Sequence, residues 1–242
     1  MAQTASPIPI AVSTAGAITP QQPPSTLATD AMTSANATRT TTKTPKPTPT
    51  VQISIPDPSI ATNTQLMHAL LTLINTVYTS AESGIFSPAY QRTTLAELTT
   101  LLHARELALA WDHTNTNTNT NTSTNPQPPS LVGTIRVFPL TPQLADIGML
   151  CCAPSLSGTG VGRRLVEFAE NHARRVLGAK TMQLEVLSPV EFVHPLKVRF
   201  QSWYERMGYA IVRVGDFGDE FPHLQPHLVT RIEYRVFEKR LV

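Results

Sequence analysis

Three glycines stand at alternate positions in the stretch SLSGTGVGRRL, residues 155–165, namely Gly158, Gly160 and Gly162. An apolar run precedes this stretch and a segment of helical periodicity follows it. Glycine lets backbone amides approach a ligand closely, and a helix start adds free N–H groups and a positive dipole end. Because Arg163 and Arg164 add positive charge, the stretch predicts a pyrophosphate-binding loop. The alternative is a tight strand-to-helix turn without a ligand, for which one glycine would be enough.

The spacing of the glycines restricts which phosphate ligand is expected. No glycine is followed five positions later by Gly-Lys-Ser or Gly-Lys-Thr, so the chain has no P-loop. In the dinucleotide pattern G-x-G-x-x-G, counting from Gly158 puts the third glycine at position 163, which is Arg163. The pattern therefore argues against a nucleotide-dependent oxidoreductase, although Glu185 follows on the next predicted strand, where a ribose ligand would lie.

The two cysteines, Cys151 and Cys152, are adjacent and therefore point to opposite faces of a strand. They cannot join distant parts of the chain, and their spacing suits no metal site, so a reducing interior and no metal are expected. No histidine stands at a spacing that would pair with either of them as a nucleophile. We interpret both as core residues.

Alternating strands and helices surround the glycine loop. The periodicity predicts strands over residues 51–55, 106–111, 131–138, 145–152, 182–187, 209–214 and 232–237, with helix continuation as the alternative for 106–111. Helices are predicted from Thr64 to about Ser83, from Thr94, from Val161 to about Leu177, and over 197–207. This order indicates an α+β fold with sheet on both sides of the loop.

Two segments are not expected to pack. Residues 1–49 are rich in Ala, Ser, Thr and Pro and predict a disordered tail, with an organellar transit peptide as the alternative. Residues 113–130 hold a Thr/Asn repeat and predict a solvated loop at a hairpin tip, with a polar interaction segment as the alternative. The net charge of +2 and the absence of an apolar run of about 20 residues favour neither nucleic acid nor a membrane as partner.

Three matched segments make residues 50–242 resemble the GNAT superfamily of N-acetyltransferases. Residues 147–154 resemble its fourth strand and the following turn, and Ser157 to Gly162 resemble its (Gln/Arg)-x-x-Gly-x-(Gly/Ala) coenzyme A loop. The segment WYERMGY, residues 203–209, resembles the family's Tyr-Glu-Lys-hydrophobic-Gly-Phe/Tyr segment. The resemblance implies the GNAT fold, a central mixed and mostly antiparallel sheet flanked by helices.

The resemblance also implies a reaction, in which acetyl-CoA gives its acetyl group to a primary amine by direct attack in a ternary complex. Tyr204 stands at the position of the family's general acid. A phenol is protonated at neutral pH and can donate its proton to a thiolate, so the residue suits that role. Its alternative role is to pack the end of a helix. Glu185 is the base candidate, with Asp146, His194 or a bound water as alternatives. The implied coenzyme contacts are Leu150, Cys151, Cys152, Ser157, Gly158, Thr159, Gly160, Val161, Gly162, Arg163 and Lys197.

Two residues depart from the family pattern. Ser157 stands where Gln or Arg is preferred, and Lys197 stands where many members have an Asn that contacts pantetheine. These departures leave open a second function, a GNAT-like domain that binds coenzyme A or a protein partner with weak or no catalysis.

The acceptor is expected to be a small-molecule or peptide amine, and the protein a cytoplasmic monomer or homodimer, with a nuclear or organellar location as the alternative. In the family, the loop between the first two helices, here residues 83–92, and the segments near His194 and over 216–226 set the acceptor. Phe86, Tyr90 and Phe217 would provide an apolar lining. The carboxylates expected to receive a cation are Asp216, Asp219 and Glu220.

Overall fold

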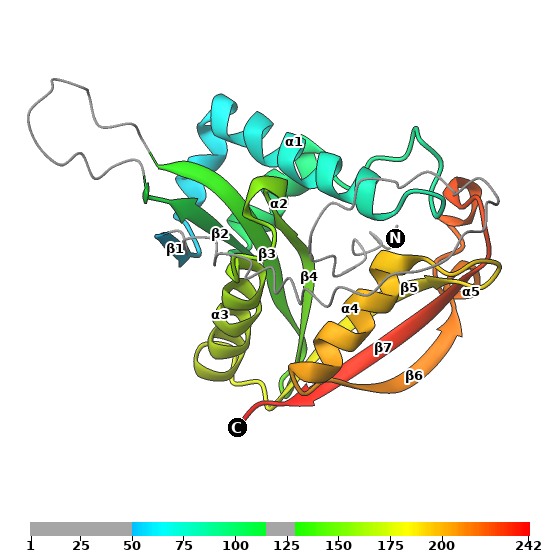
Figure 1. The fold of residues 1–242 in the computed structure, drawn as a ribbon. Helices are drawn as coiled ribbons and strands as arrows, with labels where there is room; N and C mark the ends of the chain where they lie inside the picture. Colours follow the sequence, from blue (N-terminus) through cyan, green and yellow to red (C-terminus); the bar gives the residue numbers. More distant parts are fainter. Residues whose placement is uncertain (1–49, 115–128) are drawn as a thin grey trace, which may run out of the picture.

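This computed structural model describes residues 50–114 and 129–242, which form one sheet flanked by helices (Figure 1). The predicted tail over 1–49 and most of the predicted loop over 113–130 lie outside the described residues. The strands are β1 (Val51–Ser54), β2 (Leu107–Asp112), β3 (Ser130–Thr141), β4 (Leu144–Cys152), β5 (Thr181–Pro189), β6 (Ala210–Asp216) and β7 (Ile232–Arg240). The helices are α1 (Thr64–Ala81), α2 (Leu95–His103), α3 (Val161–Arg175), α4 (Pro195–Arg206) and the short α5 (Phe217–Glu220).

The strands form one mixed sheet in the order β1-β2-β3-β4-β5-β7-β6. All neighbouring pairs are antiparallel except β4 and β5, which run parallel with α3 as their connection. The α+β, mostly antiparallel architecture predicted from the sequence is therefore confirmed.

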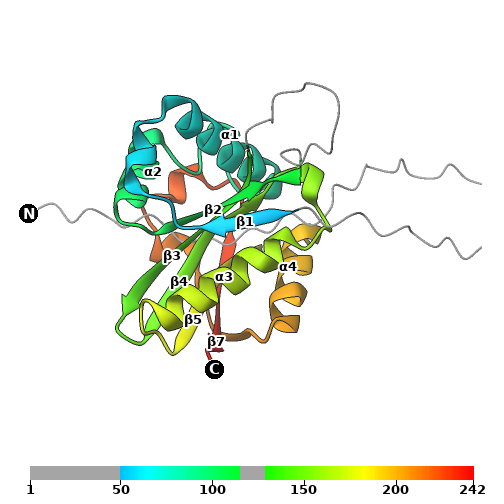
Figure 2. The ribbon, with the colours of Figure 1, turned by 90° about the vertical axis from the view of Figure 1, so that its left-hand side faces the viewer.

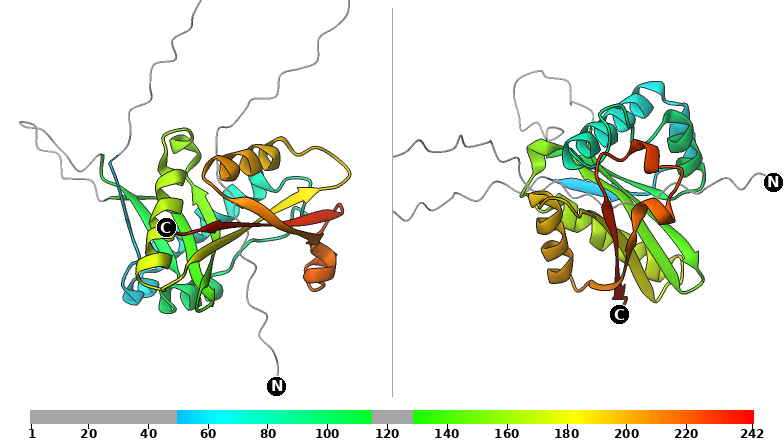
Figure 3. Two further views of the ribbon diagram at one scale, coloured as in Figure 1. Left: turned by 90° about the horizontal axis from the view of Figure 1, so that it is seen from below. Right: turned by 90° about the vertical axis from the view of Figure 1, so that its right-hand side faces the viewer.

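Helices cover both faces of this sheet, with α1 and α2 on one face and α3 and α4 on the other (Figure 2). The segment from α5 to β7 lies on the α1 face (Figure 3), where the Ser87 N–H donates to the His227 carbonyl at 2.8 Å. Both layers pack on one continuous apolar core that includes Leu70, Leu165 and Phe237.

Local signals predicted the helix ends well. The Asn63 side chain accepts a hydrogen bond from the Leu66 N–H at the start of α1, and the Thr94 hydroxyl caps α2 through the Glu97 N–H at 3.2 Å. The prediction for α4 was late by two residues, because Pro195 occupies the first turn, where a missing N–H costs no hydrogen bond. The predicted strand over 106–111 is β2, and its helical alternative was wrong.

Candidate active site

The sheet opens between its two parallel strands. β4 pairs with β5 only where Leu144–Asp146 face Thr181–Gln183, and β5 then pairs with β7 as far as Pro189. β4 meanwhile continues beside β3 to Cys152. From Ile147 onward, no strand among the described residues pairs with the edge of β4 that faces β5. The backbone groups on this edge can therefore pair with an extended ligand, as a further strand would.

A β-bulge lies in the open part of β4. Thr134 faces Cys151 and Arg136 faces Gly148, so Met149 and Leu150 together oppose one residue of β3, and Met149 has a φ of 46°. The Ala153 N–H donates to β3 at 2.8 Å, so alternation along the strand turns the N–H groups of Leu150 and Cys152 away from β3. These are two of the three positions that the sequence predicted to hold the coenzyme.

The glycine loop ends where α3 begins. Gly158 and Gly160 have φ values of 76° and 88°, and a Cβ added at either position would meet no atom within 4 Å. Gly160 is the N-cap of α3 and has no side chain that could cap the helix. No capping hydroxyl or carboxylate therefore accepts a hydrogen bond from the first N–H groups of α3, those of Val161, Gly162 and Arg163. Their positive φ values favour glycine, and the open space beside them leaves room for a ligand to approach the backbone.

The polar side chains beside the loop already have protein contacts. The Thr159 hydroxyl donates to the Leu156 carbonyl at 2.6 Å, which stabilises the turn. The Arg163 side chain is exposed and pairs with Glu167 at 3.1 Å, while Arg164 donates to the Val51 carbonyl of β1. The anion-binding character of the loop therefore depends on its backbone, with Arg163 the cation that solvent reaches.

We expect Gly160→Ala to weaken coenzyme binding beyond its effect on stability. Alanine in the left-handed region costs about 1–2 kcal/mol, and its methyl group would enter the open space of the loop. Gly178→Ala is the matched control, because Gly178 has a φ of 73° and equally open surroundings at the other end of α3. Both variants should lose similar stability in denaturant unfolding, but only Gly160→Ala should raise the Kd for coenzyme A, by about tenfold. Equal Kd values for the two variants would contradict a role of the loop in binding.

Tyr204 lies in the last turns of α4 with its side chain fully buried. Its hydroxyl has no hydrogen-bond partner among the described residues, although buried hydroxyls are nearly always paired. Burial raises the pKa of Tyr204, and the nearby Tyr78, Cys152 and Glu185 raise it further. The phenol is therefore protonated at neutral pH, and its surroundings join α4, α1 and the open end of β4.

Lys197 makes a buried ion pair that links the two helical layers. Its Nζ lies 3.2 Å from Glu82 Oε1, and both side chains are 3% exposed or less. Glu82 directly follows α1, whereas Lys197 belongs to the first turns of α4. Burial lowers the pKa of Lys197, while the Glu82 carboxylate opposes that shift. The coenzyme contact predicted for Lys197 stays a prediction, and the pairing with Glu82 was not predicted.

Glu185 belongs to a buried acidic cluster at the point where β4 and β5 separate. The Gln183 amide donates to Glu185 Oε1 at 2.6 Å and to Asp146 Oδ2 at 3.1 Å, and the other oxygen of each carboxyl group has no partner among the described residues. Burial raises the pKa of Glu185 to about 7 and raises that of Asp146 well above its usual range. Near pH 7 the pair therefore holds protons that isolated carboxyl groups would have lost.

The raised pKa values predict a stability that decreases with pH. A carboxyl group whose pKa is higher in the folded than in the unfolded state stabilises the fold at low pH, and this contribution is lost as the pH rises from about 4.5 to about 7. Asp146→Asn removes one of the two interacting carboxyl groups and should flatten this dependence. Asp219→Asn, at an exposed position, is the control and should leave it unchanged. Unfolding in urea at pH 5 and pH 8 measures the effect, and identical pH dependence in all three proteins would contradict the burial argument.

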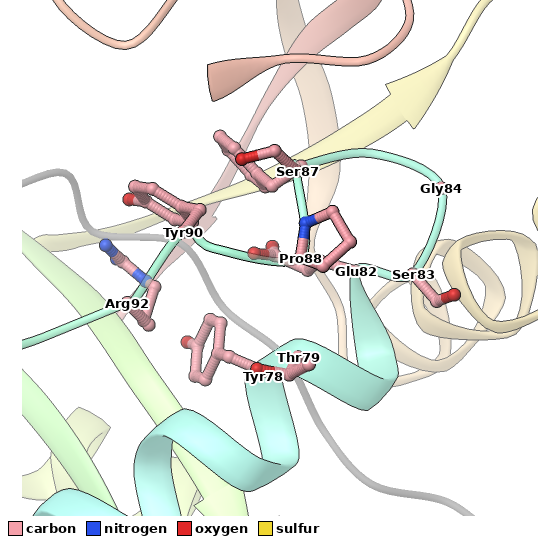
Figure 4. A pocket seen from close by; sticks show the side chains of 10 residues that line it. Tyr78, Thr79, Glu82, Ser83, Gly84, Ser87, Pro88, Tyr90 and Arg92 are labelled. Atoms are coloured by element: carbon pink, nitrogen blue, oxygen red, sulfur yellow. The ribbon is translucent and has the colours of Figure 1, made fainter.

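A pocket of about 270 Å³ lies between the end of α1 and the 83–92 loop (Figure 4). Its walls are Tyr78, Thr79, Glu82, Ser83, Gly84, Phe86, Ser87, Pro88, Tyr90 and Arg92. The rings of Phe86 and Tyr90 stack at 4.4 Å, and Phe217 packs edge-on against Phe86 at 6.0 Å. The three aromatic residues predicted to line an acceptor site are therefore in one cluster, with Phe217 behind the pocket wall.

The charged residues of this pocket differ from those predicted. Asp216 pairs with Arg231 at 2.9 Å, and Glu220 pairs with Arg213, so these two carboxylates already have cationic partners. The carboxylate that lines the pocket is Glu82, and the cation is Arg92, buried at 5% exposure. The loop predicted to set the acceptor lines this pocket, and its role in acceptor binding stays a prediction. Sequence reasoning singled out neither Glu82 nor Arg92, because neither stands in a recognisable motif.

The comparisons with known proteins agree with this geometry. Residues 129–211 match the family model described as acetyltransferase (GNAT) domain. Among curated proteins, none matches this sequence. An aminoglycoside 6'-N-acetyltransferase complexed with coenzyme A superposes with a TM-score of 0.52 at 18% identity, over 79% of this chain and 97% of its own. A putative acetyltransferase from Salmonella typhimurium with its cofactor acetyl-CoA has a TM-score of 0.50 at 10% identity, over 79% and 94%.

Residues 129–211 of this chain therefore match a GNAT acetyltransferase domain, and the fold of the described residues is the GNAT fold. No helix among the described residues is long and apolar enough to cross a membrane. The same residues contain no group of three or more histidine, cysteine or acidic side chains arranged to hold a metal ion.

Proposed function

We propose that the protein transfers the acetyl group of acetyl-CoA to a primary amine by direct attack in a ternary complex. The observation that carries the proposal is the unpaired edge of β4, which ends at Cys152 shortly before the glycine loop and lies near Tyr204, whose pKa the charge of Cys152 affects. A helix start with accessible amides, a strand edge able to pair with the amides of pantetheine, and a buried phenol without a partner among the described residues thus belong to one part of the fold. Structures that share the fold contain coenzyme A or acetyl-CoA, which supports the same assignment.

The proposed coenzyme contacts lie on the glycine loop, the start of α3 and the unpaired edge of β4. The backbone of Ser157 to Arg163 would hold the pyrophosphate, where the first amides of α3 are accessible. The amides of Leu150 and Cys152 would pair with pantetheine and polarise the thioester carbonyl. Both cysteines are buried with raised thiol pKa values, so they contribute backbone rather than nucleophilic chemistry. Lys197 would contact the coenzyme while it keeps its ion pair with Glu82.

In the proposed reaction the acceptor nitrogen loses two protons. The acceptor ammonium loses the first to Glu185, directly or through water, and the free amine attacks the thioester carbon. A C–N bond forms, the C–S bond breaks, and the departing thiolate takes the proton of the Tyr204 hydroxyl. The acylated nitrogen loses its second proton to the Tyr204 phenolate, directly or through water, which restores the phenol. Tyr204 lies within electrostatic reach of Glu185, because the Glu185 charge contributes to the raised pKa of Tyr204 after the larger effect of burial. Asp146 and His194, whose pKa is lowered by burial, stay the alternatives to Glu185.

Amine-dependent release of coenzyme A thiol tests this function. With acetyl-CoA and a panel of primary amines, we expect thiol and N-acetylated amine to form in equal amounts. Calorimetry with acetyl-CoA and with NAD(P) should show binding of acetyl-CoA alone. Binding of acetyl-CoA without release on any amine would instead support the second candidate, a coenzyme-binding domain without catalysis, for which the serine at position 157 is the supporting observation.

A further inference from the structure

The charged side chains around the pocket beside α1 already have partners within the protein. Glu82 forms the buried ion pair with Lys197 at 3.2 Å. The Arg92 guanidinium lies over the Tyr78 ring, 5.1 Å from its centroid, and hydrogen-bonds with the hydroxyls of Tyr78 and Tyr90. A charged group of a ligand in this pocket would have to displace these contacts or give up water without a new partner, and both cost free energy.

The rest of the pocket wall is largely apolar and aromatic. The rings of Phe86 and Tyr90 stack with their centroids 4.4 Å apart and their planes at 18°, and Pro88 lines the same pocket (Figure 4). The volume of about 270 Å³ lies at the small end of the roughly 300–1,000 Å³ typical of ligand pockets. This space suits a single ring or a branched alkyl group.

The mouth of the pocket is also apolar. Gly84 belongs to the pocket wall, and a Cβ added there would lie 3.3 Å from the Phe192 ring, so the loop between β5 and α4 meets the pocket at this point. The Val229 N–H donates to the Ile85 carbonyl at 3.0 Å, which brings a second loop to the same place. Phe192 and Val229 are 41% and 55% exposed, so an apolar ligand that enters here meets exposed apolar side chains first.

The pocket adjoins the proposed reaction centre. Helix α1 packs on β4, and Tyr78 of α1 belongs to the pocket wall. After burial, the Tyr78 phenol contributes most to the raised pKa of Tyr204, which places the two phenols within electrostatic reach. A ligand that extends inward past Tyr78 would therefore bring its inner end toward Tyr204 and the open edge of β4.

We propose that this pocket binds the uncharged ring or branched alkyl group of a hydrophobic primary amine, whose amine lies inward beyond Tyr78. That this amine is the acetyl acceptor rests on the proposed function, whereas its binding in the pocket is a separate property. Amines that carry a second charge in place of the apolar group, such as diamines and amino acids with a distant carboxylate, should be poor ligands.

Calorimetry on the protein saturated with coenzyme A tests the binding. 2-Phenylethylamine should bind at least about tenfold more tightly than 1,5-diaminopentane or 6-aminohexanoate, in which an ammonium or a carboxylate replaces the ring. Equal affinity for the three compounds, tighter binding of either doubly charged compound, or no detectable binding of 2-phenylethylamine would overturn the proposal.

A substitution that fills the pocket tests where the ring binds. Thr79 is an exposed residue of α1 that lines the pocket, and Thr72 is an exposed residue about two turns earlier on the same side of the helix. Thr79→Trp and Thr72→Trp should have similar stability in urea, but only Thr79→Trp should weaken binding of 2-phenylethylamine, by about tenfold or more. Unchanged affinity of a folded Thr79→Trp variant would place the ring elsewhere and overturn the proposal.

Thiol release with the same three compounds separates this proposal from the proposed function. Faster release with 2-phenylethylamine supports both, and release only with the two doubly charged compounds supports acetyl transfer but overturns the hydrophobic amine as acceptor. If 2-phenylethylamine binds with the stated preference and no compound causes release, the pocket assignment holds and the proposed transferase activity fails.

Discussion

Tyr204→Phe should lower acetyl transfer by about 100-fold while making the protein more stable. General acid catalysis contributes roughly 10²–10⁴-fold, and a phenyl ring has no proton for the thiolate. The same substitution removes a buried hydroxyl that has no partner among the described residues, and such a group costs about 1–3 kcal/mol. Turnover by thiol release, Kd for coenzyme A by calorimetry and unfolding in urea measure the three effects.

This pattern distinguishes a catalytic hydroxyl from a packing role. If Tyr204 only packs the end of α4, removal of its hydroxyl should leave turnover unchanged, whatever its effect on stability. Tyr209→Phe is the matched control, because its hydroxyl donates to Glu170 at 2.9 Å and its removal should lower stability. Unchanged turnover of Tyr204→Phe with wild-type affinity for the coenzyme would rule out the acid role.

Lys197→Met should be among the most destabilising single substitutions in this chain. It leaves the Glu82 carboxylate buried without its cation, and breaking such a pair costs about 3–5 kcal/mol. Adding Glu82→Gln should restore most of the loss, because the remaining amide carries no charge. Urea unfolding of the two single variants and the double variant gives the coupling energy, with Lys180→Met at an exposed lysine as control.

The same three variants, which form a double-mutant cycle, also test the predicted contact of Lys197 with the coenzyme. A double variant that is stable and binds coenzyme A normally would show that Lys197 acts through Glu82 alone. A double variant that is stable but binds coenzyme A weakly would support a direct contact as well. Single variants whose effects simply add would contradict the ion pair as an energetic unit.

The features that sequence reasoning predicted correctly depend on local chemistry. Thr94 caps α2 and the glycine loop directly precedes α3, because capping and loop conformation depend on neighbouring residues. The position of the loop relative to α3 was predictable for the same reason. The fold class followed from the order of the elements, together with the resemblance of three short segments.

The features that sequence reasoning missed depend on contacts between distant residues. Glu82 and Lys197 are 115 positions apart, and nothing local to either residue indicates its partner. The bulge at Met149 arises from the register between β3 and β4, and a methionine carries no signal for a φ of 46°. Arg92 lines a pocket because the 83–92 loop folds over the end of α1. Asp216 and Glu220 were expected to be free for a ligand, and arginines elsewhere in the chain pair with them.

Amide hydrogen exchange with and without coenzyme A tests the central claim most directly, namely that the coenzyme lies along the open edge of β4. Because the N–H groups of Leu150 and Cys152 point away from β3, they should become protected when the coenzyme binds, together with the amides of Val161, Gly162 and Arg163. The Ala153 amide, already bonded to β3, should change little. Binding that leaves Leu150 and Cys152 unprotected, or protects a different surface, would contradict the assignment of this opening as the active site.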